Sequence, residues 1–146
     1  MKVAFVLGTT AGGTGRHVQM LVTGCAVRGI SSVVAGPAET QLDFGFGAPA
    51  VQFEAVQFGD RPNVRDGLAV LRLRQVLARS AADVVHAHGL RAGALAALAL
   101  SLRPTAAPVP LVVTVHNAPP PSGVTAAVYQ ALELIVARSA TTVLCV

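Results

Sequence analysis

Tryptophan is absent from this chain, and other aromatic residues are scarce, with five phenylalanines and a single tyrosine, Tyr129. Proteins that bind single-stranded nucleic acid stack bases on aromatic rings, so this composition argues against a nucleic-acid partner. Charged residues are also few, at 12% of the 146 residues, whereas 53% are hydrophobic. A chain of this length and composition folds around a core, and we expect one domain over residues 1–146.

Cysteine is nearly absent too, with only Cys25 and Cys145. Neither lies in a C-x-x-C spacing, and unpaired cysteine usually behaves as a small hydrophobic residue, so we predict two buried free thiols. Long apolar runs are missing as well. The run at 92–102 falls far short of the roughly 20 residues that a membrane span requires. The apolar start of the chain ends at Gly8, too early for a signal peptide.

Acidic residues number only seven, against eleven Lys and Arg, and the net charge is +4. This excess favours phosphate, nucleotide or anionic-lipid partners. None of the acidic residues clearly ends a core strand, which argues against a glycosidase with paired carboxylates. The chain also has no G-x-S-x-G motif, which argues against a serine hydrolase.

The abundant aliphatic residues form short apolar runs that alternate with helical patterns. Strands are expected at 2–7, 30–35, 83–87, 110–115 and 141–146, and helices at 14–28, 63–80, 90–102 and 123–139. Continuous apolar strands indicate a parallel sheet that is buried on both faces. We therefore predict an α/β fold with a doubly wound, mainly parallel Rossmann-like sheet and helices on both faces. The alternating segment 51–58 predicts a further short strand, and the Gly-rich segment 43–47 predicts a mobile loop.

A glycine-rich segment joins the first expected strand to the first helix. The free N–H groups and the dipole at a helix N-terminus favour a phosphate there, and Gly12 and Gly13 would allow its close approach. The dinucleotide fingerprint would need glycine at Val18 and an acidic residue after the second strand, where Gly36 stands. A Walker loop would need lysine at Thr14. A tight turn without a ligand remains the alternative.

Three histidines lie near the ends of predicted strands. We predict that His86 and His88 point to opposite faces of their strand, so that only one of them addresses a given pocket. His88 comes last before a glycine, and His116 ends the next strand beside Asn117, so these two histidines are candidate functional residues at the crevice. A loop-capping role is the alternative. His86 is interpreted as a core histidine whose hydrogen bonds are satisfied.

Arginines recur every seven residues along the expected helix at 63–80. This spacing places Arg65, Arg72 and Arg79 on one face, and Arg61 lies just upstream. An ordinary solvated helix face is one interpretation. Contact with anionic lipid headgroups or with an anionic acceptor is the other.

Four segments together resemble a known family. They are Gly12-Gly13 followed by His17-Val18, the helix end Arg28-Gly29, the run Asp-Val-Val-His-Ala-His-Gly at 83–89, and the run Thr-Val-His-Asn at 114–117. In this order, over essentially the whole chain, they are similar to the N-terminal half of a family 4 glycosyltransferase of the GT-B fold. The resemblance implies a retaining, hexosyltransferase-type enzyme that moves a sugar from a nucleotide-sugar donor to an acceptor without a bound metal or cofactor. It also implies a cytoplasmic location, at the inner face of a membrane where the arginine stripe contacts lipid.

The resemblance further implies roles for individual residues. These are Gly12 and Gly13 at the donor diphosphate, His88 and His116 as catalytic residues, and His17, Arg91 and Asn117 on the acceptor side. The family's C-terminal nucleotide-sugar-binding domain is absent from this chain, so we expect the chain alone to be inactive. A Rossmann-like binding module without chemistry and a dinucleotide-dependent oxidoreductase domain remain the alternatives.

Overall fold

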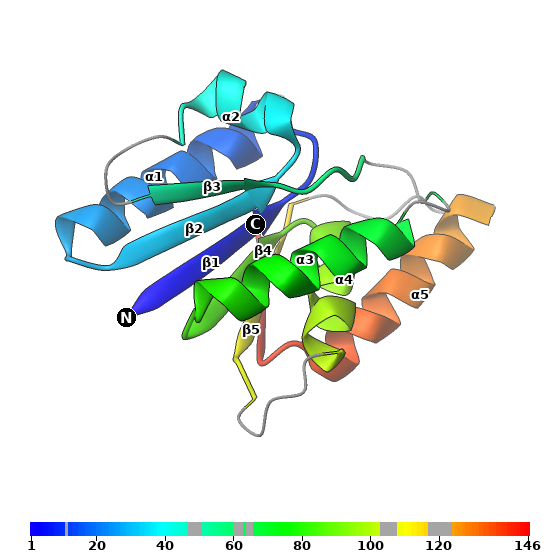
Figure 1. Cartoon of the computed structure of the whole chain (residues 1–146). Coiled ribbons are helices and arrows are strands. Elements are labelled where there is room, and N and C mark those ends of the chain that lie inside the picture. Colours follow the sequence, from blue (N-terminus) through cyan, green and yellow to red (C-terminus); the bar gives the residue numbers. More distant parts are fainter. Residues whose placement is uncertain (11, 47–50, 60–62, 64–65, 103–107, 117–123) are drawn as a thin grey trace.

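The computed structural model describes residues 1–10, 12–46, 51–59, 63, 66–102, 108–116 and 124–146. Its strands are β1 (Lys2–Leu7), β2 (Ser31–Gly36), β3 (Val51–Ala55), β4 (Val84–His88), β5 (Leu111–Val115) and β6 (Thr142–Cys145). They form one sheet in the order β3-β2-β1-β4-β5-β6, and every neighbouring pair is parallel (Figure 1). The predicted parallel sheet, including the further short strand at β3, is therefore confirmed.

The helices are α1 (Gly13–Val27), α2 (Ala38–Phe44), α3 (Asp66–Ser80), α4 (Leu90–Ser101) and α5 (Val124–Ser139). Helices α1 and α2 cover one face of the sheet, and α3, α4 and α5 cover the other (Figure 1). The predicted doubly wound α/β fold is confirmed. Within the described residues, no helix has both the length and the apolar character needed to cross a membrane.

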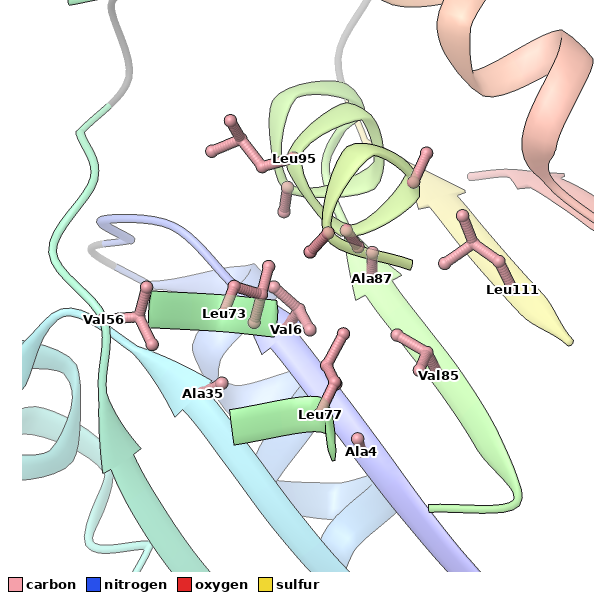
Figure 2. Close-up of a cluster of buried hydrophobic side chains, with 14 of the residues drawn as sticks. Ala4, Val6, Ala35, Val56, Leu73, Leu77, Val85, Ala87, Leu95 and Leu111 are labelled. Carbon is pink, nitrogen blue, oxygen red and sulfur yellow. The ribbon is translucent and has the colours of Figure 1, made fainter. Parts of the chain in front are cut away.

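Two hydrophobic cores lie on the two faces of the sheet, because successive side chains of a strand point to opposite sides. In β1, Ala4 and Val6 enter the larger core under α3, α4 and α5, whereas Phe5 and Leu7 enter the smaller core under α1. Figure 2 shows the larger core, in which Leu73 and Leu77 of α3 pack onto the sheet. Both leucines are fully buried, so this helix is held by its apolar stripe.

The predicted mobile loop at 43–47 is wrong at residues 43–44, which belong to helix α2, and residue 47 lies outside the described residues. Helix α2 continues through Phe44, and Gly45 ends it in the left-handed conformation with φ 60°. Phe46 is buried, and its ring stacks on Phe53 of β3 with centroids 6.3 Å apart. Two phenylalanines that flank one glycine anchor this segment to the smaller core, which outweighs the turn character of its glycine.

The far edge of the sheet differs from the prediction of strands buried on both faces. All residues of β6 are exposed, because this strand pairs with β5 alone and no described helix covers it. The prediction of two buried thiols is consequently wrong for Cys145, which lies exposed on β6, while Cys25 of α1 is half-buried. Both cysteines are free, as expected.

The order of the strands creates a switch point at β1. The chain leaves β1 towards β2 on one side, and it returns on the other side of β1 to form β4. In open parallel sheets the crevice at the carboxyl ends of two such strands is the usual ligand site. The residues that follow β1 and β4 therefore define where a site is expected.

Candidate functional site

A cavity of about 460 Å³ lies at this switch point. Its walls come from the segments that follow β1, β3, β4 and β5, together with one side of α5. The described residues that line it are Gly8, Thr9, Thr10, Thr14, Phe58, Gly59, His88, Gly89, Leu90, Arg91, Ala92, Val115, His116, Tyr129 and Leu132. Three of the predicted site residues, His88, His116 and Arg91, line the same space.

The glycine-rich turn after β1 leads directly into α1. Gly12 precedes the helix with φ 131°, a value that favours glycine, and it accepts the backbone hydrogen bond from Arg16 at 3.2 Å. Gly12 and Gly13 lie beside the cavity but are not among the described residues that line it, and the exposed Gly13 begins the helix. Free N–H groups at the start of α1 can bind an anion. A role for these two glycines at a diphosphate stays a prediction.

All four histidines of the chain gather on the α1 face of the sheet. The ring of His88 lies 4.2 Å from that of His86, 5.7 Å from that of His116 and 5.6 Å from that of His17, measured between centroids. His17 comes from α1, and its ring meets those of His88 and His116 edge-on. Phe5 of β1 packs against the cluster, with its ring centroid 5.8 Å from that of His86.

The prediction that His86 and His88 point to opposite faces is wrong. Side chains two positions apart on a strand project from the same face, so His86, His88 and Phe5 share the side that α1 covers. His86 lies deeper along the strand, where its Nε2 contacts Thr114 Oγ1 at 2.8 Å. This partner agrees with the interpretation of His86 as a core histidine with a satisfied ring nitrogen. The ring of His86 packs against the ring of His88 on the side that is nearer the middle of the strand.

Burial favours the uncharged form of His86, His88 and His116. Burial and, after it, the three neighbouring imidazoles lower the pKa of His88 to about 3. Burial also lowers the pKa of His86 and that of His116, with smaller contributions from nearby histidines. A neutral imidazole donates through one ring nitrogen and accepts through the other. At neutral pH, His88 and His116 are therefore hydrogen-bonding groups and not charged acids.

His88 and His116 contact each other across the ends of β4 and β5. The Nδ1 atom of His88 lies 3.4 Å from the Nε2 atom of His116. The other ring nitrogen of His88, Nε2, is buried and has no hydrogen-bond partner among the described residues. In the part of the chain that the structure describes, no group of three or more His, Cys, Asp or Glu side chains could hold a metal ion.

Arg91 occupies the first turn of α4, directly after the histidine strand. Its side chain is only 11% exposed, and its Nη2 donates to the Oδ1 atom of Asp66 at the start of α3. The sequence showed no reason to pair these two residues, because they are 25 positions apart on different helices. Asn117, the remaining acceptor-side candidate, lies outside the described residues.

The arginine stripe is only partly described, since Arg61 and Arg65 fall outside the described residues. Arg72 and Arg79 both approach Glu54 of β3, with nitrogen–oxygen distances of 3.2 and 3.7 Å. These side chains remain partly exposed and are not among the described residues that line the cavity. Their contact with a membrane or an acceptor stays a prediction.

Fold and site together define a doubly wound α/β domain with a ligand crevice at its switch point. A sequence model of the glycosyl transferase 4-like domain matches residues 12–146. The chain belongs to this family, which confirms the resemblance drawn from its motifs. No curated protein sequence matches the chain significantly.

Solved structures share the fold at low sequence identity. MurG of Acinetobacter baumannii superposes with a TM-score of 0.67 at 15% identity, over 99% of this chain and 41% of the MurG chain. This chain thus spans about two fifths of that protein. A phenylacrylic acid decarboxylase of Aquifex aeolicus reaches a TM-score of 0.54 at 14% identity, over 99% of this chain and 80% of its own. A short-chain dehydrogenase/reductase of Veillonella parvula, solved with NADP, has the same TM-score and identity, with 99% and 67% coverage.

Proposed function

We propose that this chain forms the acceptor-side domain of a retaining glycosyltransferase, which transfers a sugar from a nucleotide-sugar donor to an acceptor without a bound metal or cofactor. The observation that carries the proposal is the cavity in which His88 and His116 meet the glycine-rich turn of a chain from the glycosyl transferase 4-like family. A C-terminal domain that binds the nucleotide would complete the enzyme, and the chain alone would be inactive.

In this proposal the neutral histidines orient the transferred sugar. Nε2 of His88 has no protein partner among the described residues, so a sugar hydroxyl would satisfy it. A buried hydrogen bond of this kind is strong and directional because water does not compete for it. The N–H groups at the start of α1, at Gly12 and Gly13, would stabilise the departing diphosphate.

Two other functions remain possible outcomes of the test. A binding module would hold a nucleotide sugar in the same cavity without transfer. A dinucleotide-dependent oxidoreductase would share the fold of the Veillonella parvula enzyme, but Val18 stands where the dinucleotide fingerprint has its third glycine. Strand β2 also ends at Gly36 followed by Pro37, where NAD-dependent members carry an acidic residue for the ribose. These departures favour the glycosyltransferase.

The test uses the native protein at the length at which it is isolated from its source. It is incubated with a panel of uridine, guanosine and adenosine diphosphate sugars, and release of the nucleoside diphosphate is measured. One donor is expected to react, and NMR of the product should show the anomeric configuration of the donor. Replacement of His88 by Ala should lower turnover on the order of 100-fold, because a positioned hydrogen bond at the reacting sugar is lost.

The matched control is Arg138→Gln, which removes a positive charge from the exposed last turn of α5, outside the cavity lining, and should leave turnover unchanged. Binding of a nucleotide sugar without release of diphosphate would favour the binding module. Tight binding of NAD or NADP, without reaction of any nucleotide sugar, would favour the oxidoreductase. An inverted product would overturn the retaining mechanism alone.

A further inference from the structure

We propose that the cavity recognises an anionic group of the acceptor, a phosphate or a carboxylate, through Arg91 and the N-terminus of α4. The term acceptor rests on the proposed function, but the anion site itself does not. The site lies beside His88 on the wall formed by Gly89, Leu90 and Ala92.

The guanidinium of Arg91 is only partly used by the protein. Asp66 accepts from Nη2 alone, while Nε and Nη1 are buried without a hydrogen-bond partner among the described residues. An arginine carries five N–H donors, and leaving buried donors unpaired is unfavourable. Small movements of this side chain within the cavity wall would bring these donors to an anionic ligand, which would satisfy them.

The position of Arg91 on its helix is also unusual. A positive side chain is disfavoured in the first turn of a helix, because the helix dipole places partial positive charge there. Helix α4 has no acidic residue in its first turn, and its N-cap, Gly89, has no side chain that could cap the helix. The backbone donors of the first turn and the guanidinium of Arg91 therefore lie at the same end of the helix, where Asp66 accepts from the guanidinium.

A second, independent feature marks the same wall. His88 is 3% exposed, and its Nε2 atom is a buried ring nitrogen without a partner among the described residues. The described lining of the cavity contains one cation, Arg91, and no acidic side chain. The remaining polar groups of that lining are hydroxyls and imidazoles, which suit the neutral hydroxyls of a sugar or polyol. An acceptor with both a charged oxyanion and neutral hydroxyls fits this arrangement.

The role of Asp66 makes the proposal testable in two directions. The carboxylate of Asp66 competes with any anionic ligand for the guanidinium of Arg91. Replacement of Asp66 by Asn should release the guanidinium and tighten anion binding, whereas Arg91→Gln should weaken it. If the pair served only to join α3 to α4, both substitutions would lower stability and neither would tighten binding.

The experiment is a titration of the full chain with inorganic phosphate, followed by amide NMR, with acetate as the second arm. We expect saturable shifts at the amides of Leu90, Arg91 and Ala92. Arg91→Gln should weaken binding about tenfold or more, which is typical for loss of a hydrogen bond to a charged group. Asp66→Asn should tighten binding severalfold, and Arg138→Gln, on the exposed last turn of α5, should leave the affinity unchanged. Preference for phosphate over acetate, or the reverse, identifies the anion.

Shifts confined to the amides of Gly12 to Gly15 would place the phosphate at α1 and overturn the proposal. An unchanged affinity in Arg91→Gln, or no tightening in Asp66→Asn, would also overturn it. Thermal unfolding of each variant reports whether it is folded. If Arg91→Gln does not fold, Arg91→Lys is used instead, and it should also weaken binding because lysine lacks the forked donors of the guanidinium. Phosphate binding is measured without turnover. A failure of the anion site is therefore distinguishable from a failure of the proposed transferase function, in which no nucleotide sugar reacts.

Discussion

At the scale of single residues, four imidazoles in contact are the most unusual feature of the molecule. Neutral histidines can pack together, but charged ones repel one another, and burial adds the cost of removing a charge from water. The cluster thus couples the ionisation of His88 to the integrity of the fold. It also keeps the hydrogen-bonding nitrogens of the cavity in one charge state across the neutral pH range.

Acidification is therefore expected to destabilise the protein. The pKa of His88 is lowered in the folded chain from 6.5 to about 3. Between these values the unfolded state binds more protons than the folded state, so the free energy of unfolding falls as the pH decreases. The slope should reach up to about 1.4 kcal/mol per pH unit for one proton. Urea unfolding from about pH 7 to about pH 4 measures it.

The matched variant for this measurement is His88→Gln, which keeps a polar side chain but cannot take up a proton. Its stability should depend less on pH over the same interval, even if it is lower throughout. Stability that is constant down to about pH 4 in the unsubstituted protein would contradict the prediction. An equal slope in both proteins would show that His88 is not the residue responsible.

At the scale of elements, α4 packs unusually close to the sheet. A Cβ atom added at Gly93 would lie 2.7 Å from Cγ1 of Val113 and 3.2 Å from Cγ2 of Val136. Both valines are buried, and a valine side chain has little freedom to move aside. Glycine at this position lets α4 approach β5, and this approach carries the start of α4, with Arg91, to the cavity.

Replacement of glycine by alanine should consequently have opposite effects in two helices. At Gly93 it should lower the free energy of unfolding by about 1–3 kcal/mol, because the core becomes overpacked. At Gly24 of α1 the nearest atom to the added Cβ is a flexible arginine end at 3.5 Å, so alanine should stabilise the helix by about 0.5–1 kcal/mol. Chemical denaturation of the two variants measures both values. A stabilised Gly93→Ala protein would contradict the close packing.

At the scale of the whole molecule, helices cover both faces of the sheet except at the β6 edge, which no described helix covers. Strand β6 exposes Val143 and Leu144, at 45% and 44%, and Val146, which follows the strand, is 80% exposed. Exposed edge strands offer unpaired backbone groups that pair readily with another chain. The β6 edge therefore favours contact with further polypeptide, either a second copy or another domain.

The chain on its own is expected to self-associate through this edge. Light scattering should give a mass that rises above 14.8 kDa as the concentration increases. Leu144→Lys should reduce the association, because a charge on the exposed edge opposes pairing with a second edge. Leu42→Lys, on α2 and also exposed, should not. A strict monomer at high concentration would contradict this prediction.

Sequence patterns alone were sufficient to predict the alternation of strands and helices, the doubly wound parallel fold and the family. The elements and the fold follow from local periodicity, and the apolar runs at 2–7 and 30–35 match β1 and β2 within a residue. The family was predicted from the resemblance of four motifs. The prediction that His86 and His88 point to opposite faces was wrong because the strand period was misapplied. The two-residue period already places both rings on one face, so the sequence contained the signal.

Tertiary structure alone decided which distant residues meet. The contact of His17 with His88, the pairing of Asp66 with Arg91 and the exposure of Cys145 depend on the order of the strands and on the close packing of helices. No local pattern encodes these distances, because they arise from packing between elements far apart in the chain. The sequence by itself determined the elements and the family, whereas the tertiary structure decided the chemistry that the cavity offers.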